Sequence, residues 1–195
     1  MYKIIDISQE VFSCKVFPGD PSPEKKKMLE IDKGDVCNLT SFSMCAHNGT
    51  HIDAPFHFIN DGKTVEQLKL TSFVGDCFVA LHNGDVTSED ASDIMKRAIA
   101  AGAPDRILIA GKATVTVEAA RVFSESNIKL LGNESQTVGP EDSPKDVHMI
   151  LLGSEIVLLE GIVLTDVPEG KYFLSAAPLE LGGSDGAPCR AYLIK

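Results

Sequence analysis

The sequence predicts an α/β domain built on a curled, mixed β-sheet, and three observations lead to that prediction. The chain has 195 residues, which suits one domain spanning residues 1–195 with a core of its own. Short extended runs separated by turn residues fill the first third, a pattern typical of antiparallel strands. The middle third alternates strand and helix patterns, which favours parallel strands joined by right-handed crossovers. A sheet that contains both kinds of strand is mixed, and we expect it to curl.

The first third shows three extended runs and one dense turn. Residues 2–8, 27–32 and 36–46 are predicted strands. Residues 17–23 read Phe-Pro-Gly-Asp-Pro-Ser-Pro, which indicates a turn and loop. The three lysines at 25–27 lie between glutamates, so we expect an exposed turn there.

The remaining two thirds alternate strand and helix signals. Residues 88–101 carry apolar side chains at helical spacing, with Ser88 as the expected N-cap and Gly102 as the stop. A further helix is expected near residues 144–152, where Ser143 can cap it and Pro144 suits its first turn. The other predicted elements are strands at 76–82, 106–110, 128–131, 171–177 and 190–194 and a helix at 117–126.

Composition excludes several classes of function. The formal charge of −10 leaves no basic face for a nucleic acid to bind. Five scattered cysteines without a CxxC pair indicate reduced thiols in a cytoplasmic protein. No apolar run approaches the roughly 18–20 residues of a membrane span, and the first residues do not resemble a signal peptide. We therefore expect a cytoplasmic protein with neither a nucleic-acid nor a membrane partner.

Chemistry-bearing side chains concentrate in residues 47–57, which read H-N-G-T-H-I-D-A-P-F-H. Imidazole and carboxylate are ligands for zinc, manganese and similar divalent ions. On an extended chain His51, Asp53 and His57 point to one face, and the first two lie roughly 7 Å apart, within reach of one ion. His47 would be roughly 13 Å from His51, so the chain must fold back, and Gly49 permits that turn.

This segment resembles the signature of the metal-dependent cyclase family, which includes the bacterial kynurenine formamidases (arylformamidases) and the isatin hydrolases. The matching positions are His47-x-Gly49-Thr50-His51-x-Asp53-x-Pro55-x-His57. The early Pro18-Gly19-Asp20 turn and the late His148 and Glu160-Gly161 are also similar to the family. The resemblance implies a swivelling β/β/α fold, with a curled, barrel-like mixed β-sheet flanked by helices.

The resemblance also implies a set of site residues. The metal ligands it implies are His47, His51, Asp53, His148 and Glu160. The first three would bind one ion, the last three a second ion where two are present, and Asp53 would bridge them. His57 would transfer protons beside the metal. Independently of the resemblance, Glu160 follows a strongly apolar run, and a buried carboxylate needs a partner such as a metal.

The activity implied is that of a metal-dependent amide hydrolase of the kynurenine formamidase type, an enzyme of tryptophan catabolism. Metal-bound hydroxide would attack a small-molecule N-formyl arylamine and release formate and the amine. Zinc is the expected ion, one or two per subunit, with manganese as the alternative. A homodimer or homotetramer is also implied, in which the loop at residues 17–23 could complete a neighbouring pocket.

Three alternatives to this activity stay open: isatin-hydrolase-like opening of a cyclic amide, a metal-holding or ligand-binding domain without turnover, and a purely structural protein. The third leaves the His/Asp cluster unexplained, and His57, which need not bind metal, weighs against the second.

The chain departs from the family at positions that bear on the substrate. Phe17 stands where the formamidases usually carry tryptophan, and Glu134, Thr137 and Gly139 replace their Asp-x-x-Ser-x-Asp pattern. Aromatic side chains that could line a ring pocket are Phe12, Phe17, Phe56 and Phe58.

Overall fold

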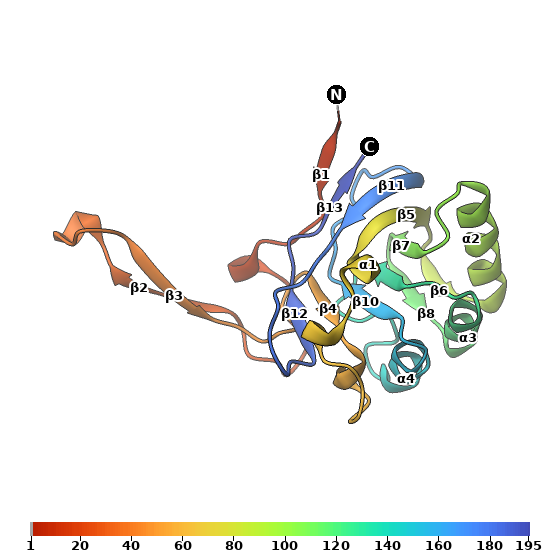
Figure 1. Ribbon diagram of the computed structural model, residues 1–195, viewed down its shortest axis with the longest axis horizontal. Coiled ribbons are helices and arrows are strands. Elements are labelled where there is room, and N and C mark those ends of the chain that lie inside the picture. Colours follow the sequence, from red (N-terminus) through yellow and green to blue (C-terminus); the bar gives the residue numbers. More distant parts are fainter. Residues whose placement is uncertain (1) are drawn as a thin grey trace.

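A curled sheet forms the body of the protein, with the longer helices on one side and a two-stranded arm projecting from the other (Figure 1). The computed structural model describes residues 2–195. Across these residues the main sheet has nine strands in the order β1-β13-β11-β5-β7-β9-β10-β4-β12. Strands β5, β7, β9 and β10 are mutually parallel, and the flanking pairs are antiparallel. The predicted mixed, curled sheet is thus confirmed.

The helices and strands have the following bounds. The strands of the main sheet are β1 Ile4–Asp6, β4 His51–Asp53, β5 Val74–Leu81, β7 Arg106–Ala110, β9 Leu130–Asn133, β10 Val157–Glu160, β11 Gly170–Ser175, β12 Gly186–Pro188 and β13 Tyr192–Ile194. The two small pairs are β2 Glu24–Leu29 with β3 Leu39–Ser43, and β6 Gly84–Val86 with β8 Ala113–Val115. The α-helices are α1 Leu70–Phe73, α2 Ser88–Ala100, α3 Val117–Glu125 and α4 Lys145–Gly153.

The central strands are apolar on both faces because each face has its own core. On β7, Ile107 and Ile109 pack toward α2, α3 and α4, whereas Leu108 and Ala110 point into the concave side of the sheet. On β10, Leu158 belongs to the helix side. Strands buried on both faces read as continuous apolar runs, which is why the middle of the chain was predictable as a parallel block.

The arm consists of β2, β3 and the connection between them (Figure 1). Within residues 2–195 these two strands pair only with each other. The lysines at 25–27 lie within β2, so the predicted turn there is wrong, although the segment is exposed as expected. The predicted strand at 36–46 is shortened to Leu39–Ser43, and residues 31–33 form a 3₁₀ turn.

Both predicted helix caps differ in detail. The hydroxyl of Thr87, not Ser88, accepts the hydrogen bond from Asp90 N at the start of α2, and the carboxylate of Asp90 reciprocates. Helix α4 has Pro144 at its N-cap and no side-chain cap, so Ser143 does not serve. Across residues 2–195 no helix combines the length and apolarity that crossing a bilayer demands.

Candidate active site

The register between β4 and β10 gathers three site residues on one face of the sheet. Glu160 pairs with His51 and Leu158 pairs with Asp53. Ile52 points into the concave core, so its two neighbours point to the opposite, helix-covered face. Glu160 shares that face, since it lies two residues after Leu158. The sequence prediction that His51 and Asp53 share a face is borne out by this geometry.

A sharp turn brings His47 back toward His51, as the sequence requires. Gly49 has φ +66, and a Cβ there would lie 2.9 Å from Cβ of Cys14. The side chain of Gln136 clamps the turn: its Oε1 accepts from Gly49 N at 3.1 Å, and its Nε2 donates to Gly49 O at 3.0 Å. The rings of His47 and His51 lie 5.1 Å apart, edge to face. The turn therefore brings into contact two side chains whose Cα atoms would lie roughly 13 Å apart on an extended chain.

Helix α4 carries His148 over the same face. Its Nε2 lies 3.2 Å from Oε1 of Glu160 and 3.6 Å from Oδ2 of Asp53. His51 Nε2 lies 3.3 Å from Oδ1 of Asp53 and 3.6 Å from Oε2 of Glu160. All four of these residues are no more than 2% exposed.

The orientation of these two imidazoles suits metal ligation. His51 Nδ1 donates to the carbonyl oxygen of Gly49 at 3.0 Å, and His148 Nδ1 donates to that of Pro144 at 2.8 Å. Both rings thereby present Nε2 to the carboxylates. Backbone carbonyls commonly fix metal-binding histidines in this way.

One buried atom without a partner shows whether these residues fit a metal ion. Among residues 2–195, Oδ2 of Asp53 is buried and has no hydrogen-bond partner. An unpaired buried carboxylate oxygen is costly, and a cation is its natural partner. Ligand atoms of His51, Asp53 and Glu160 lie within 4.8 Å of one another, as do those of His47, Asp53 and His57. The nitrogen and oxygen donors suit zinc or manganese, so the residues present fit a divalent ion.

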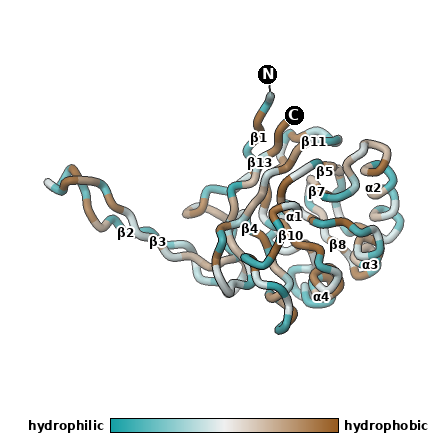
Figure 2. The backbone as a smooth tube through the Cα atoms, viewed as in Figure 1, coloured by the Kyte–Doolittle hydropathy of each residue, from teal (hydrophilic) through white to brown (hydrophobic). Residues whose placement is uncertain are grey.

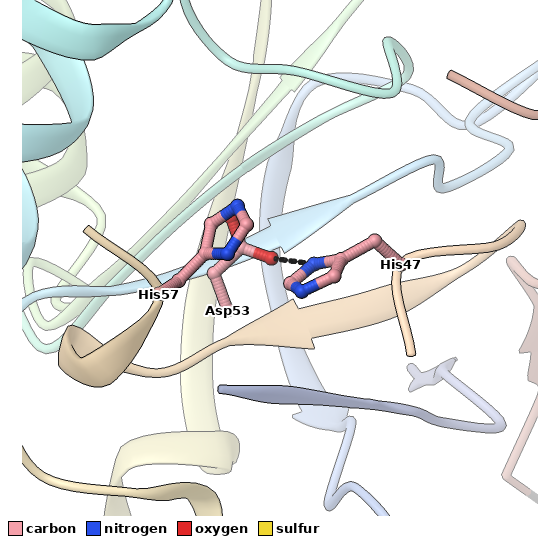
Figure 3. Close-up of side chains that lie close together, drawn as sticks. All are labelled: His47, Asp53 and His57. Carbon is pink, nitrogen blue, oxygen red and sulfur yellow. Dashed lines mark hydrogen bonds and ion pairs between the residues drawn. The ribbon is translucent and has the colours of Figure 1, made fainter. Parts of the chain in front are cut away.

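A second cluster adjoins the first and includes a residue that the sequence analysis missed. His47 Nδ1 donates to Oδ1 of Asp53 at 2.8 Å, and its Nε2 donates to Oδ2 of Asp185 at 2.8 Å. His57, from the 3₁₀ turn after β4, donates through Nδ1 to the same Asp185 oxygen at 3.1 Å. In Figure 3 the rings of His47 and His57 lie beside the Asp53 carboxylate.

The electrostatics of the cluster favour positive charge. Burial lowers the pKa of His47 and His51, but hydrogen bonds to the neighbouring carboxylates outweigh it and raise each pKa to about 10. Burial likewise raises the pKa of Asp53, yet its bonds to the two histidines hold that pKa well below the usual range. His57 differs, because burial dominates and lowers its pKa. A divalent ion would supply the positive charge that the carboxylates attract.

A pocket of about 380 Å³ opens onto the clustered side chains. Phe17, Phe58 and Pro144 supply apolar walls, and Cys45 and Asp20 also line it. Of the four aromatic residues considered from the sequence, Phe12 and Phe56 are not among the lining residues. Phe12 instead packs edge to face on Phe42 of the arm, with ring centres 6.2 Å apart. Phe17 belongs to the loop that could complete a neighbouring subunit's pocket, and here it lines the pocket of its own chain.

Of the three residues that replace the Asp-x-x-Ser-x-Asp pattern, all within residues 2–195, only Thr137 lines this pocket. Its hydroxyl is buried and lacks a hydrogen-bond partner within residues 2–195. The carboxylate of Glu134 binds backbone instead, because it accepts from Gly111 N at 2.7 Å and from Leu164 N at 2.8 Å. Gly139 packs beside Val147.

The five ligands named from the sequence are therefore gathered in one place, although their grouping differs from the expected one. The ring of His47 lies closer to His57 and Asp185 than to the group of candidate ligands that contains Glu160. Asp53 contacts residues of both groups. Which residues bind an ion stays a prediction. Asp185 carried no signal beyond a glycine-rich stretch, Gly182-Gly183-Ser184-Asp185-Gly186, which reads as a turn.

Comparison with known proteins places the chain in a family. The model of the family described as "Putative cyclase" matches residues 5–140. The chain belongs to the cyclase family. Two relatives, both described as kynurenine formamidase, match over nearly their whole length. The protein from Erythrobacter litoralis is 31% identical over 98% of this chain and 93% of its own. The protein from Salinibacter ruber is 32% identical over 97% and 96%.

Two solved structures show the same fold. A structure described as a potential metal-dependent hydrolase with cyclase activity superposes with a TM-score of 0.84 at 28% identity, covering 100% of this chain and 98% of the other. Isatin hydrolase A from Labrenzia aggregata gives a TM-score of 0.84 at 21% identity, covering 99% and 93%. The fold implied by the sequence resemblance is thus confirmed.

Proposed function

We propose that this cyclase-family chain is a metal-dependent amide hydrolase of the kynurenine formamidase type. It would cleave an N-formyl arylamine to formate and the free amine. The observation that carries the proposal is the buried cluster of His51, Asp53, Glu160 and His148, with one unsatisfied carboxylate oxygen, at the base of a pocket with aromatic walls. The full-length similarity to two proteins described as kynurenine formamidases supports the substrate class.

The ligands proposed for the ion are the five residues named from the sequence: His47, His51, Asp53, His148 and Glu160. Zinc is the proposed ion and manganese the alternative, one or two per subunit, since both accept imidazole and carboxylate donors. When bound, such an ion polarises a carbonyl and lowers the pKa of a water molecule toward 7.

The chain's own residues supply the rest of the chemistry. His57 lies beside the ligand cluster, with its ring centre 4.0 Å from that of His47. Its lowered pKa keeps the imidazole neutral near pH 7, the state in which it can accept a proton. His57 takes a proton from the attacking water and returns it to the amine nitrogen as the C–N bond breaks. Phe17 and Phe58 enclose the aryl ring, and the unpaired hydroxyl of Thr137 offers one hydrogen bond to the substrate.

We also propose that residues 1–195 form one hydrolase domain that acts in the cytoplasm as a homodimer or homotetramer. The exposed apolar side chains of the arm support assembly: Val36 is 94% exposed, and Phe42 is 59% exposed although it packs edge to face with Phe12. Figure 2 shows hydrophobic stretches along this exposed arm. An isolated two-stranded hairpin is marginally stable in water, so a second copy of the chain is the proposed support. The substrate class would place the enzyme in tryptophan catabolism.

The test joins elemental analysis to hydrolysis assays. Protein purified without chelator should hold stoichiometric zinc or manganese and should release formate from N-formylkynurenine faster than it opens isatin. Faster opening of isatin would favour the cyclic-amide alternative. A metal-loaded protein inactive on both would favour the non-catalytic one. Full activity without any divalent metal would contradict the proposed function outright.

A further inference from the structure

Asp185 joins the site from a segment far along the chain, and its backbone is held in place. The turn before it contains Gly183 at φ +75. The carbonyl oxygen of Asp185 accepts a hydrogen bond from Ala54 N at 2.9 Å. The next residue, Gly186, pairs with Asp53 where β12 lies against β4. Backbone pairing with the end of strand His51–Asp53 thus fixes the position of the Asp185 carboxylate relative to that strand.

The contacts of this carboxylate converge on two stacked rings. Oδ2 of Asp185 accepts from His57 Nδ1 at 3.1 Å and from His47 Nε2 at 2.8 Å. The two rings stack with centres 4.0 Å apart and planes 27° apart. Phe58 meets the His57 ring edge to face, with ring centres 4.6 Å apart. Stacking, edge contact and the hydrogen bond together fix how the His57 ring is turned.

The hydrogen bond also decides which nitrogen of His57 carries the proton. An ionised carboxylate only accepts hydrogen bonds, so the nitrogen facing it must be a donor. In a neutral imidazole the other nitrogen is then an acceptor. For His57 that nitrogen is Nε2, which has no hydrogen-bond partner among residues 2–195.

We propose that Asp185 is a positioning residue that holds His57 in the Nδ1–H tautomer and so leaves Nε2 as the basic nitrogen in the pocket. The inference deepens the proposed function and rests on it for the reaction, but the tautomer can be measured without any substrate. In the reaction, the proton of the attacking water goes to Nε2 and then to the amine nitrogen as the C–N bond breaks. Asp185 lines the pocket and acts through its hydrogen bond to His57, without itself taking the proton.

Nuclear magnetic resonance of ¹⁵N-histidine-labelled, zinc-loaded protein at pH 8 tests the tautomer, with His57→Gln identifying the signals. Wild type should show protonated Nδ1 and unprotonated Nε2 on His57. Asp185→Asn replaces the obligate acceptor with an amide that can donate to Nδ1, so the proton should move to Nε2. Asp61→Asn, an exposed aspartate outside the pocket, is the matched control and should leave the signals unchanged. A wild-type ring protonated on Nε2, or a tautomer unaffected by Asp185→Asn, would overturn the proposal.

Kinetics separate positioning from a general structural role. Asp185→Asn should lower kcat by roughly 10²–10⁴-fold with KM little changed, and Asp185→Glu, which keeps a carboxylate, should recover part of the loss. Metal content must stay near wild type. If it falls in proportion to kcat, the carboxylate acts through His47 and the proposal is wrong. An enzyme that hydrolyses no N-formyl arylamine would contradict the proposed function, whereas the tautomer measurement would still decide this inference.

Discussion

Two antiparallel pairs in this protein, β2–β3 of the arm and β4–β10 of the site, contrast in almost every respect. The arm strands are consecutive in sequence and are exposed along most of their length. In the part of the chain that the structure describes they pair only with each other. The site strands are far apart in sequence, lie inside the nine-stranded sheet and are buried at every residue. The pairing of the arm strands is thus determined locally, and these strands have little packing. The site strands are buried within the sheet, and their pairing depends on the complete fold.

This difference predicts where the molecule tolerates change. Substitutions in the site should reduce metal binding, catalysis or stability, because the surrounding side chains are buried and held in place. Substitutions in the arm should hardly affect the folded chain and should act on association instead.

The largest effect is expected from two of the proposed ligands. His51→Ala and Asp53→Ala should each remove bound metal and reduce activity to background, because both side chains face one buried cluster. Elemental analysis and an assay on the same preparation measure the two losses together. Stoichiometric metal in Asp53→Ala would show that this carboxylate is not a ligand.

A smaller loss is expected at His57. His57→Ala should leave metal content near wild type and lower kcat by roughly 10²–10⁴-fold, the usual contribution of a general acid–base group. If metal and activity fall together, as expected for His51→Ala, then His57 is a ligand. Full metal with unchanged kcat would refute the proton-transfer role and revive the non-catalytic alternative.

A third effect should appear in stability at Gly186. A Cβ there would lie 2.7 Å from Cε1 of His47 and 2.7 Å from the carbonyl oxygen of Ile52. Gly186→Ala should therefore lower the free energy of unfolding by about 1–3 kcal/mol, the usual cost of overpacking, and should reduce activity. Gly182→Ala is the matched control, since a Cβ at Gly182 would meet no atom within 4 Å. Urea denaturation of both variants checks the difference; equal midpoints would mean that the packing around His47 yields easily.

The smallest effect on the isolated chain is expected in the arm. Val36→Ser should change the free energy of unfolding of the monomer by less than about 0.5 kcal/mol, as for other exposed positions. Together with Phe42→Ser it should nevertheless shift a dimer or tetramer toward monomer in sedimentation velocity. Leu108→Ala, in the core, is the contrast and should cost about 2–5 kcal/mol. An unchanged sedimentation coefficient in the double variant would exclude the arm from assembly.

Sequence reasoning worked where the decisive signal is local. Strand β7 occupies the predicted residues 106–110, and α2 and α3 differ from prediction only at their ends, because apolar periodicity over a short window fixes both. The candidate ligand motif is visible in the sequence because its members fall within eleven residues, and Gly49 indicates where the chain must turn. His148 could be assigned only through the family resemblance, whereas Glu160 was also indicated by the apolar run that precedes it.

Other features were hidden because they depend on distant partners. Asp185 reaches the site because β12 pairs with β4. Its glycine-rich stretch has no alternation of apolar and polar residues that would predict this pairing. The lysines of β2 looked like a turn because strands exposed on both faces lack the apolar alternation of a packed strand. Glu134 was grouped with substrate-facing positions, yet it satisfies two backbone amides instead.

The long sequence separations across the site have a consequence for synthesis of the protein. Thr50 binds Gly161 across 111 residues, and His57 binds Asp185 across 128. Closing such loops costs entropy that only the finished sheet offsets, so these contacts form late. A nascent chain on the ribosome therefore holds the His47–His57 segment long before Glu160 and Asp185 emerge. High-affinity ion binding would be confined to the finished chain, and the ion would then stabilise only molecules that have completed folding.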